Sequence, residues 1–263
     1  METTKPKKRQ KSSKFTFKHF EINQDKCGMK VCTDSVLFGA FVTKILEKYK
    51  EKKIENLLDI GSGTGLLSIL ISQKFNFSID SVEYDSDAYI QSLENIQPIS
   101  FCENIKIHEK KIQEYETDKK YNCIISNPPF YTNGFLPNQK IDLENSKVKA
   151  FHTASLSHDD LIDSIERLIL KDGIVFILLP ENEMKEFEKK IFEKIGMIAF
   201  EKLIMKNKKE SSILRIAIGF TFDKDLKVNE KEIIIRNEKN EYTKNYFELS
   251  KDFFIEKHFS KMN

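Results

Sequence analysis

The sequence lacks any apolar run that approaches the roughly 20 residues needed to span a membrane. Its N-terminus carries cations but no apolar core of a signal peptide behind them, so we expect a cytoplasmic protein. Cysteines are few, and none of the four has a partner at Cys-x-x-Cys spacing. Cys123 lies in a hydrophobic run that is typical of a buried strand. The sequence therefore predicts neither a bound metal nor a structural disulfide.

Net charge is also low, at +2, but the charges are unevenly distributed. Residues 1–18 hold seven Lys or Arg and one Glu, whereas the remainder holds 36 basic and 40 acidic residues. Clustered cations on a flexible arm bind nucleic acid through its phosphates, although a solubilising tail is the alternative. We predict a flexible basic tail over residues 1–14. Its candidate RNA-binding residues are Lys7, Lys8, Arg9 and Lys11.

A chain of 263 residues suits one enlarged α/β domain, because a single core can grow to roughly 250 residues before chains split. Hydrophobic residues at 40% supply that core, and charged residues at 32% supply the surface. No internal repeat is visible. We expect one domain over residues 15–263, with an N-terminal cap (15–50) and a C-terminal extension (222–263), acting as a monomer.

Apolar runs typical of strands alternate with segments of helical periodicity. This alternation predicts a Rossmann-like α/β fold with a mostly parallel, seven-stranded sheet and helices on both faces. Ser157 is the expected cap of the third helix, and Gly173 lies beyond its expected end. The polar stretch Asn133–Lys149 is expected to be a loop. The expected strands are Asn56–Gly61, Ser78–Tyr84, Asn104–His108, Tyr121–Ser126, Ile174–Leu179, Met197–Met205 and Ile213–Thr221. The expected helices are Leu66–Lys74, Ser86–Ile96, His158–Leu170 and Glu183–Ile195.

The segment Leu57–Gly65 runs from a predicted buried strand into a glycine-rich turn and then a helix. Glycines allow a ligand to approach the backbone closely, and such turns lie at the carboxyl ends of strands in open α/β sheets. Glu83 follows Gly61 by 22 residues, at the end of the next predicted strand. A carboxylate there can accept hydrogen bonds from both ribose hydroxyls. The pair predicts a nucleoside ligand.

The glycine spacing indicates which nucleoside is bound. A dinucleotide site favours G-x-G-x-x-G, whereas here the third glycine comes one residue early, with Leu66 in its place. The pattern Asp59-x-Gly61-x-Gly63-x-Gly65 instead resembles the first motif of the class I S-adenosylmethionine methyltransferases. This resemblance implies S-adenosylmethionine as the cofactor, with these four residues and Glu83 in its site. A nicotinamide or flavin site fits the spacing less well.

A second motif, Asn127-Pro128-Pro129-Phe130, directly follows the predicted strand Tyr121–Ser126. The prolines fix the backbone, and the Pro128 carbonyl together with the Asn127 side-chain oxygen can accept both hydrogens of an amino group. A planar amine is a poor nucleophile, and two fixed acceptors favour the geometry in which its lone pair faces an electrophilic methyl. Phe130 can stack on the attached ring. These four residues are the predicted catalytic set, without metal, and Asn127 is also expected to line the cofactor site.

This motif resembles the (D/N/S)-P-P-(Y/F/W) signature of amino-methyltransferases that act on adenine N6, guanine N2 or the amide of glutamine. A simple turn after a strand is the alternative, but it does not explain an asparagine at the ligand side of the sheet. The motif alone leaves the three substrates open.

The N-terminal runs Phe15–Phe20 and Asp25–Ala40 resemble the bacterial tRNA (adenine-N6)-methyltransferases that act on adenine 37 of a valine tRNA. The resemblance implies that Lys30, Thr33 and Asp34 close over the cofactor, with Asp34 near its charged end. Thr33 is also a good cap for a helix with one apolar face. That face comprises Val36, Leu37, Ala40, Phe41 and Ile45. Further matching runs are Ile233–Arg236, Glu241–Thr243 and Phe253–Phe254.

The chain departs from this family at two places. Lys111 replaces an acidic residue that would meet the cofactor's adenine, so adenine recognition is expected to rest on Ile112 and backbone. The segment before His152 lacks an arginine that relatives often carry. Three other functions are also considered for this protein: a guanine-N2 methyltransferase, a release-factor glutamine methyltransferase and a non-catalytic RNA-binding module. The glutamine enzymes carry a longer helical domain before the glycine loop than the roughly 55 residues found here.

Overall fold

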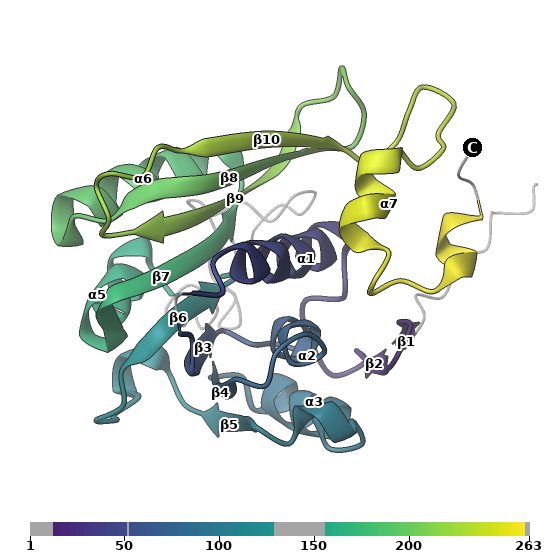
Figure 1. Ribbon diagram of the computed structural model, residues 1–263. Coiled ribbons are helices and arrows are strands. Elements are labelled where there is room, and N and C mark those ends of the chain that lie inside the picture. The colour runs from purple at the N-terminus through teal and green to yellow at the C-terminus, as the bar shows by residue number, and fades with distance from the viewer. Residues whose placement is uncertain (1–12, 52, 129–155, 261–263) are drawn as a thin grey trace, which may run out of the picture.

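The computed structural model describes residues 13–51, 53–128 and 156–260. A mostly parallel sheet forms its centre (Figure 1). The strands are β3 (Asn56–Ile60), β4 (Ser78–Glu83), β5 (Ile105–Glu109), β6 (Tyr121–Ser126), β7 (Ile169–Leu179), β8 (Ile198–Lys206), β9 (Ile213–Thr221) and β10 (Asn229–Ile234). Their order across the sheet is β10-β8-β9-β7-β6-β3-β4-β5. Only β9 runs against its neighbours β7 and β8.

Helices cover both faces of this sheet (Figure 1). Successive residues of a strand point to opposite faces, so each buried strand contributes to two cores. Leu57 and Cys123 lie in the first core, and their neighbours Leu58 and Ile124 lie in the second. The first core includes residues of α1 (Thr33–Lys48), α2 (Leu66–Ser72) and α3 (Ser86–Ile96). The second includes residues of α5 (His158–Leu168) and α6 (Glu181–Ile195).

The N-terminal and C-terminal segments pack against each other as part of the first core. The Phe17 ring stacks on Phe20 at 4.6 Å and on Phe254 at 5.9 Å between centroids. The Lys18 amide donates to the Phe253 carbonyl at 2.8 Å. The elements of these segments are β1 (Lys14–Thr16), β2 (Glu21–Asn23), α7 (Lys244–Ser250) and the 3-10 helix η3 (Glu256–Phe259). Two more 3-10 helices are η1 (Ser100–Cys102) and η2 (Ile112–Glu114). No helix in the described ranges is both long and apolar enough to cross a membrane.

The α/β fold predicted from the sequence is confirmed, but the sheet has eight strands rather than seven. The extra strand, β10, pairs in parallel with β8 at the edge of the sheet. Its sequence, Asn-Glu-Lys-Glu-Ile-Ile, is mostly polar, because an edge strand leaves most of its side chains in water. Hydrophobic periodicity therefore could not reveal it.

The third predicted helix ends earlier than expected. Ser157 is its N-cap, as predicted, since its Oγ accepts from the Asp160 amide at 3.0 Å. The helix stops at Leu168, however, and β7 begins at the very next residue. Gly173 lies beyond the helix end, as predicted, but it is part of β7. A Cβ there would lie 2.9 Å from the Leu170 carbonyl oxygen, closer than such atoms normally approach, so the position favours glycine.

The start of α1 also differs from the prediction. Cys32 occupies the N-cap position without a side-chain cap, and Thr33 is the first helical residue, so Thr33 is not the cap. The predicted apolar face of α1 is confirmed, because all five of its residues are buried. The predicted tail boundary shifts slightly, as β1 begins at Lys14. The predicted loop Asn133–Lys149 lies outside the described residues.

Candidate active site

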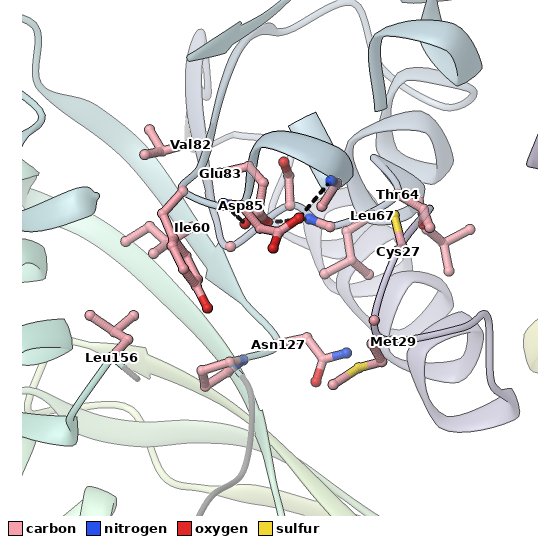
Figure 2. A pocket seen from close by; sticks show the side chains of 18 of the residues that line it. Cys27, Met29, Ile60, Thr64, Leu67, Val82, Glu83, Asp85, Asn127 and Leu156 are labelled. Atoms are coloured by element: carbon pink, nitrogen blue, oxygen red, sulfur yellow. Dashed lines mark hydrogen bonds between the residues drawn. The ribbon is translucent and has the colours of Figure 1, made fainter. Parts of the chain in front are cut away.

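A pocket of about 380 Å³ opens at the carboxyl ends of β3, β4 and β6 (Figure 2). Small-molecule sites typically have volumes of roughly 300 to 1,000 Å³, so the pocket suits a nucleoside-sized ligand. Its position agrees with the rule that ligands of open α/β sheets bind where the strand order reverses, here between β3 and β6. Among the sequence-predicted residues, those that line it are Lys30, Gly61, Gly63, Glu83, Ile112, Asn127 and Pro128.

The glycine loop between β3 and α2 forms one wall of the pocket. Gly61, Gly63 and Gly65 have φ angles of 74°, 56° and 80°, a region that residues with a Cβ rarely adopt. At Gly61 and Gly63 an added Cβ would meet nothing within 4 Å. Both residues line the pocket, so that open space faces the ligand. Gly65 instead packs close to Ile96 of α3 and begins α2.

Glu83 ends β4 and contacts this loop directly. Its Oε2 accepts from the Gly63 amide at 2.8 Å, and its Oε1 accepts from the Asp85 amide at 2.9 Å, as the dashed lines in Figure 2 show. Burial raises the pKa of this carboxyl, while the two amide donors oppose that rise. Each carboxylate oxygen keeps further acceptor capacity. Glu83 therefore fixes the loop and keeps acceptor capacity toward the pocket.

Asp59 lies beneath the glycine loop rather than on the pocket wall. It is fully buried, and its Oδ2 accepts from the Ser68 hydroxyl at 2.7 Å. Burial raises the pKa of this carboxyl to about 7. The structure thus places Asp59 where it supports the turn from below, and it is not among the residues that line the pocket.

The segment Cys27–Val31 forms a second wall, and polar side chains hold it in place. Gln24 Oε1 accepts from the Val31 amide, and Gln91 Oε1 of α3 accepts from the Lys26 amide, both at 2.8 Å. Lys30 Nζ donates to the Gln24 carbonyl at 2.8 Å. This wall is therefore positioned by hydrogen bonds to Gln91 of α3 and to the nearby Gln24.

Thr33 and Asp34 are not among the lining residues. Asp34 Oδ2 lies 3.3 Å from Arg215 Nε of β9, and Asp34 Oδ1 accepts from the Ser35 amide at 3.1 Å. Ser35, which the sequence did not single out, does line the pocket. In the structure Asp34 anchors the first turn of α1 to the sheet.

Ile112 lies in η2 on the side of the pocket near β5, and it is buried. Arg167 of α5 donates to the Ile112 carbonyl at 2.9 Å and to the Tyr115 carbonyl at 2.8 Å. Lys111, the residue that departs from the family pattern, also lines the pocket. No sequence pattern indicated Arg167 as a supporting residue, because its partners lie 52 and 55 positions away.

Asn127 and Pro128 follow β6 and line the pocket, with Asn127 at its lower side in Figure 2. Asn127 Nδ2 donates to Ser35 Oγ at 3.2 Å. Asn127 Oδ1 is buried and has no hydrogen-bond partner among the residues that the structure describes. A buried acceptor without a donor is costly, and an N–H of a ligand in the pocket can satisfy it.

Several predicted residues lie outside the described ranges. They are Lys7, Lys8, Arg9, Lys11, Pro129, Phe130 and His152.

The pocket also includes residues that were not predicted from the sequence. Asp85 stands out among them, because its Oδ1 accepts from the Ala88 amide at 2.8 Å and caps α3. The helix-capping pattern at Asp85 was readable from the sequence.

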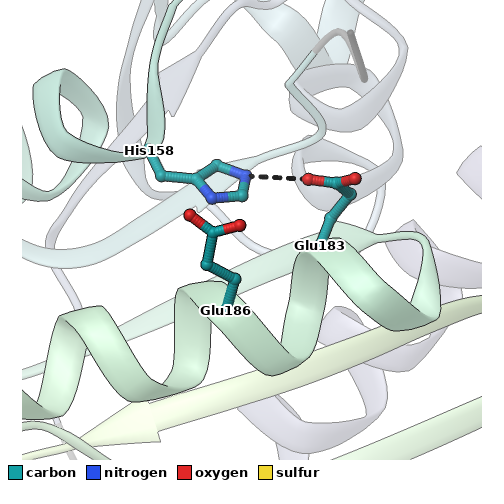
Figure 3. A group of neighbouring side chains, drawn as sticks. All are labelled: His158, Glu183 and Glu186. Carbon is teal, nitrogen blue, oxygen red and sulfur yellow. Dashed lines mark ion pairs between the residues drawn. The ribbon is translucent and has the colours of Figure 1, made fainter. Parts of the chain in front are cut away.

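Away from the pocket, His158, Glu183 and Glu186 bring ligand atoms within 4.8 Å of one another (Figure 3). His158 Nε2 lies 3.9 Å from Glu183 Oε2. Glu186, however, already pairs with Lys190 at 2.9 Å, and the same ammonium lies 3.0 Å from Asp159. A bound cation would compete with these ion pairs, so we assign the group to the packing of α5 against α6.

Comparison with known structures defines the class. A predicted O-methyltransferase from Agrobacterium tumefaciens superposes with a TM-score of 0.59 at 13% identity, covering 83% of this chain and 95% of that one. P. horikoshii TYW2 in complex with MeSAdo superposes with a TM-score of 0.55 at 14% identity, covering 80% and 71%. The family described as Methyltransferase small domain matches residues 38–141. The fold is that of the class I S-adenosylmethionine-dependent methyltransferases.

Curated relatives define the family more narrowly. A tRNA1(Val) (adenine(37)-N6)-methyltransferase from Dyadobacter fermentans is 34% identical over 80% of this chain and 82% of its own length. Proteins of the same name from Trichodesmium erythraeum and Histophilus somni are 32% and 31% identical, each over more than 90% of both chains. The chain belongs to the tRNA1(Val) (adenine(37)-N6)-methyltransferase family, which confirms the resemblance noted in the sequence.

Proposed function

We propose that this protein transfers a methyl group from S-adenosylmethionine to the exocyclic N6 of adenine 37 in the anticodon loop of a valine tRNA. The observation that carries the proposal is Asn127 Oδ1, a buried acceptor without a partner among the described residues, at a pocket with the features of a nucleoside site. The names of the relatives support the same substrate.

The residues present fit the cofactor. The open faces of Gly61 and Gly63 leave room for a ligand against the backbone, and Glu83 offers acceptors for ribose hydroxyls. Ile112 supplies an apolar surface for an adenine ring, and Lys30 contributes to the opposite wall. When bound, S-adenosylmethionine supplies an electrophilic methyl group.

The protein's part in the reaction is to hold the amine in the reactive geometry. Asn127 Oδ1 and the Pro128 carbonyl accept the two N–H hydrogens, so that the nitrogen lone pair faces the methyl group. Phe130 stacks on the adenine, by its resemblance to the family motif. Once the nitrogen has become cationic, its surplus proton passes to solvent. No nucleophilic residue enters this scheme.

An anticodon-loop base is a favourable target, because loop bases unstack at low cost. The basic N-terminal residues Lys7, Lys8, Arg9 and Lys11 are proposed to contact tRNA phosphates. We further propose that the protein works as a monomer in the cytoplasm and needs no metal.

The test is incubation with labelled S-adenosylmethionine and unmodified total tRNA, followed by nucleoside analysis. We expect label in N6-methyladenosine. Label in N2-methylguanosine or in protein would contradict the proposal and favour a guanine or glutamine substrate. Asn127→Ala should reduce turnover at least about 100-fold while leaving cofactor binding within twofold, because the lost acceptor is the one assigned to the substrate amine. Asn104→Ala, at an exposed position, is the control.

A further inference from the structure

Ser35 joins two elements that meet at the pocket. It lies in the first turn of α1, is 6% exposed and lines the pocket. Its Oγ accepts a hydrogen bond from Asn127 Nδ2 at 3.2 Å, across a separation of 92 residues in the sequence. The other end of the same amide, Oδ1, is the buried acceptor without a partner among the described residues.

The orientation of the Asn127 amide matters for the proposed reaction. An asparagine side chain has one acceptor end and one donor end, and the two are nearly the same in shape. With Oδ1 toward the substrate, the amide accepts from the target amine. After a half-turn, its NH2 would instead face the N–H groups of that amine, donor against donor. Backbone geometry alone does not favour one orientation of the amide over the other. A neighbouring group must therefore favour one of them.

Ser35 is placed to make that choice. Cys32 Sγ lies 2.9 Å from Ser35 Oγ, and either atom can be the donor of that contact. When the hydroxyl donates to the sulfur, its oxygen lone pairs are left to accept from Asn127 Nδ2. The backbone of Ser35 is fixed as well, because its amide donates to Asp34, which pairs with Arg215 of β9. The Thr33–Ser35 run thus holds a hydroxyl at a defined place.

We propose that Ser35 is a positioning residue that orients the Asn127 amide so that Oδ1 accepts from the substrate's amine. The proposal rests on the proposed amino methylation and deepens it. It also gives the Thr33–Ser35 run a role in methyl transfer, at a position where the sequence analysis expected cofactor contacts.

The test is the steady-state kinetics of Ser35→Ala on tRNA. We expect kcat to fall about tenfold, because the amide spends most of its time in the unproductive orientation, while KM for tRNA and affinity for S-adenosylmethionine stay within about twofold. Ser164→Ala, which removes a buried serine hydroxyl from α5, should leave kcat unchanged. An unchanged kcat in Ser35→Ala overturns the proposal.

A second variant separates orientation from general support of the fold. The carboxylate of Asn127→Asp has two equivalent acceptor oxygens and needs no orienting partner. Adding Ser35→Ala to Asn127→Asp should therefore cost less than twofold in kcat, whereas a tenfold loss in that background would show a structural role. If Asn127→Asp has no measurable turnover, Ser35→Thr decides. This variant keeps the hydroxyl, so restored kcat supports orientation and a loss equal to that of Ser35→Ala overturns it.

The outcome for Ser35 is distinguishable from the outcome for the substrate. The nucleoside formed by the unaltered protein tests which amine is methylated. The comparison of Ser35 variants with that protein tests positioning, whichever amine is found.

Discussion

At the residue scale, side chains of the pocket serve the ligand and the surrounding backbone together. Glu83 accepts from two backbone amides and also faces the pocket. Asn127 donates to Ser35 with one end of its amide and leaves the other end as an acceptor. Such side chains have fixed rotamers before a ligand arrives, which reduces the entropy lost on binding.

Glu83→Gln tests this double role. Glutamine has one acceptor oxygen, so its NH2 group would face either the Gly63 amide or the Asp85 amide, donor against donor. We expect the affinity for S-adenosylmethionine to fall at least tenfold, about 1.4 kcal/mol, in isothermal titration calorimetry. Glu103→Gln, at an exposed position, should bind as the unaltered protein does. Equal affinities in the two variants would refute the role assigned to Glu83.

At the scale of elements, the pocket depends on helices that begin at its edge. α5 starts at His158, close to the pocket residue Leu156, and its N-cap is Ser157. The same helix carries Arg167, which holds the carbonyls of Ile112 and Tyr115. The position of η2, and with it one wall of the pocket, is thereby linked to the packing of α5.

Ser157→Ala removes the hydroxyl that accepts from the Asp160 amide at the start of α5. We expect the free energy of unfolding to fall by about 1 kcal/mol, the usual cost of a lost N-cap, in chemical denaturation. Ser157→Asn should keep most of the stability, since asparagine caps as well as serine does. If the alanine and asparagine variants were equally stable, the cap would not be the cause.

Sequence patterns predicted the elements that rely on local signals. Buried strands such as Tyr121–Ser126 are continuous apolar runs, and the glycine loop and the asparagine motif follow them directly. The edge strand β10 was not predicted, because its side chains are mostly polar. The start of α1 was misplaced by one residue because Thr33 has the chemistry of a cap without its position. Ser35 and Arg167 were missed because their partners are distant in sequence, 92 and 55 residues away.

At the scale of the whole molecule, a carboxyl is buried in an inner strand of the sheet, β3, whose apolar residues belong to the two cores. Asp59 is fully buried in β3, and burial raises its pKa to about 7. Its ordinary pKa, in the unfolded chain, is about 3.9. Between these two values the folded protein binds a proton that the unfolded chain has lost. The contribution of protonated Asp59 to the free energy of unfolding is therefore complete below about pH 4. This contribution is lost as the pH rises through about 7.

Asp59→Asn removes this titration while keeping an oxygen that can accept from Ser68. We expect the variant to gain stability relative to the unaltered protein as the pH is raised from 5 to 8, in denaturation curves measured at each pH. Burial lowers the pKa of His258 to about 4, so His258 makes stability rise with pH rather than fall. Because His258 is present in both proteins, it does not affect their difference in stability. A stability difference that does not change with pH would contradict the raised pKa of Asp59.

The central claim is that the Asn127 site methylates adenine 37, the position named in the family's relatives. The most direct measurement is methyl transfer to an unmodified valine tRNA transcript and to the same transcript with guanine in place of adenine 37. We expect one methyl group per tRNA, recovered as N6-methyladenosine, on the first transcript and none on the second. Equal methylation of both transcripts would contradict it.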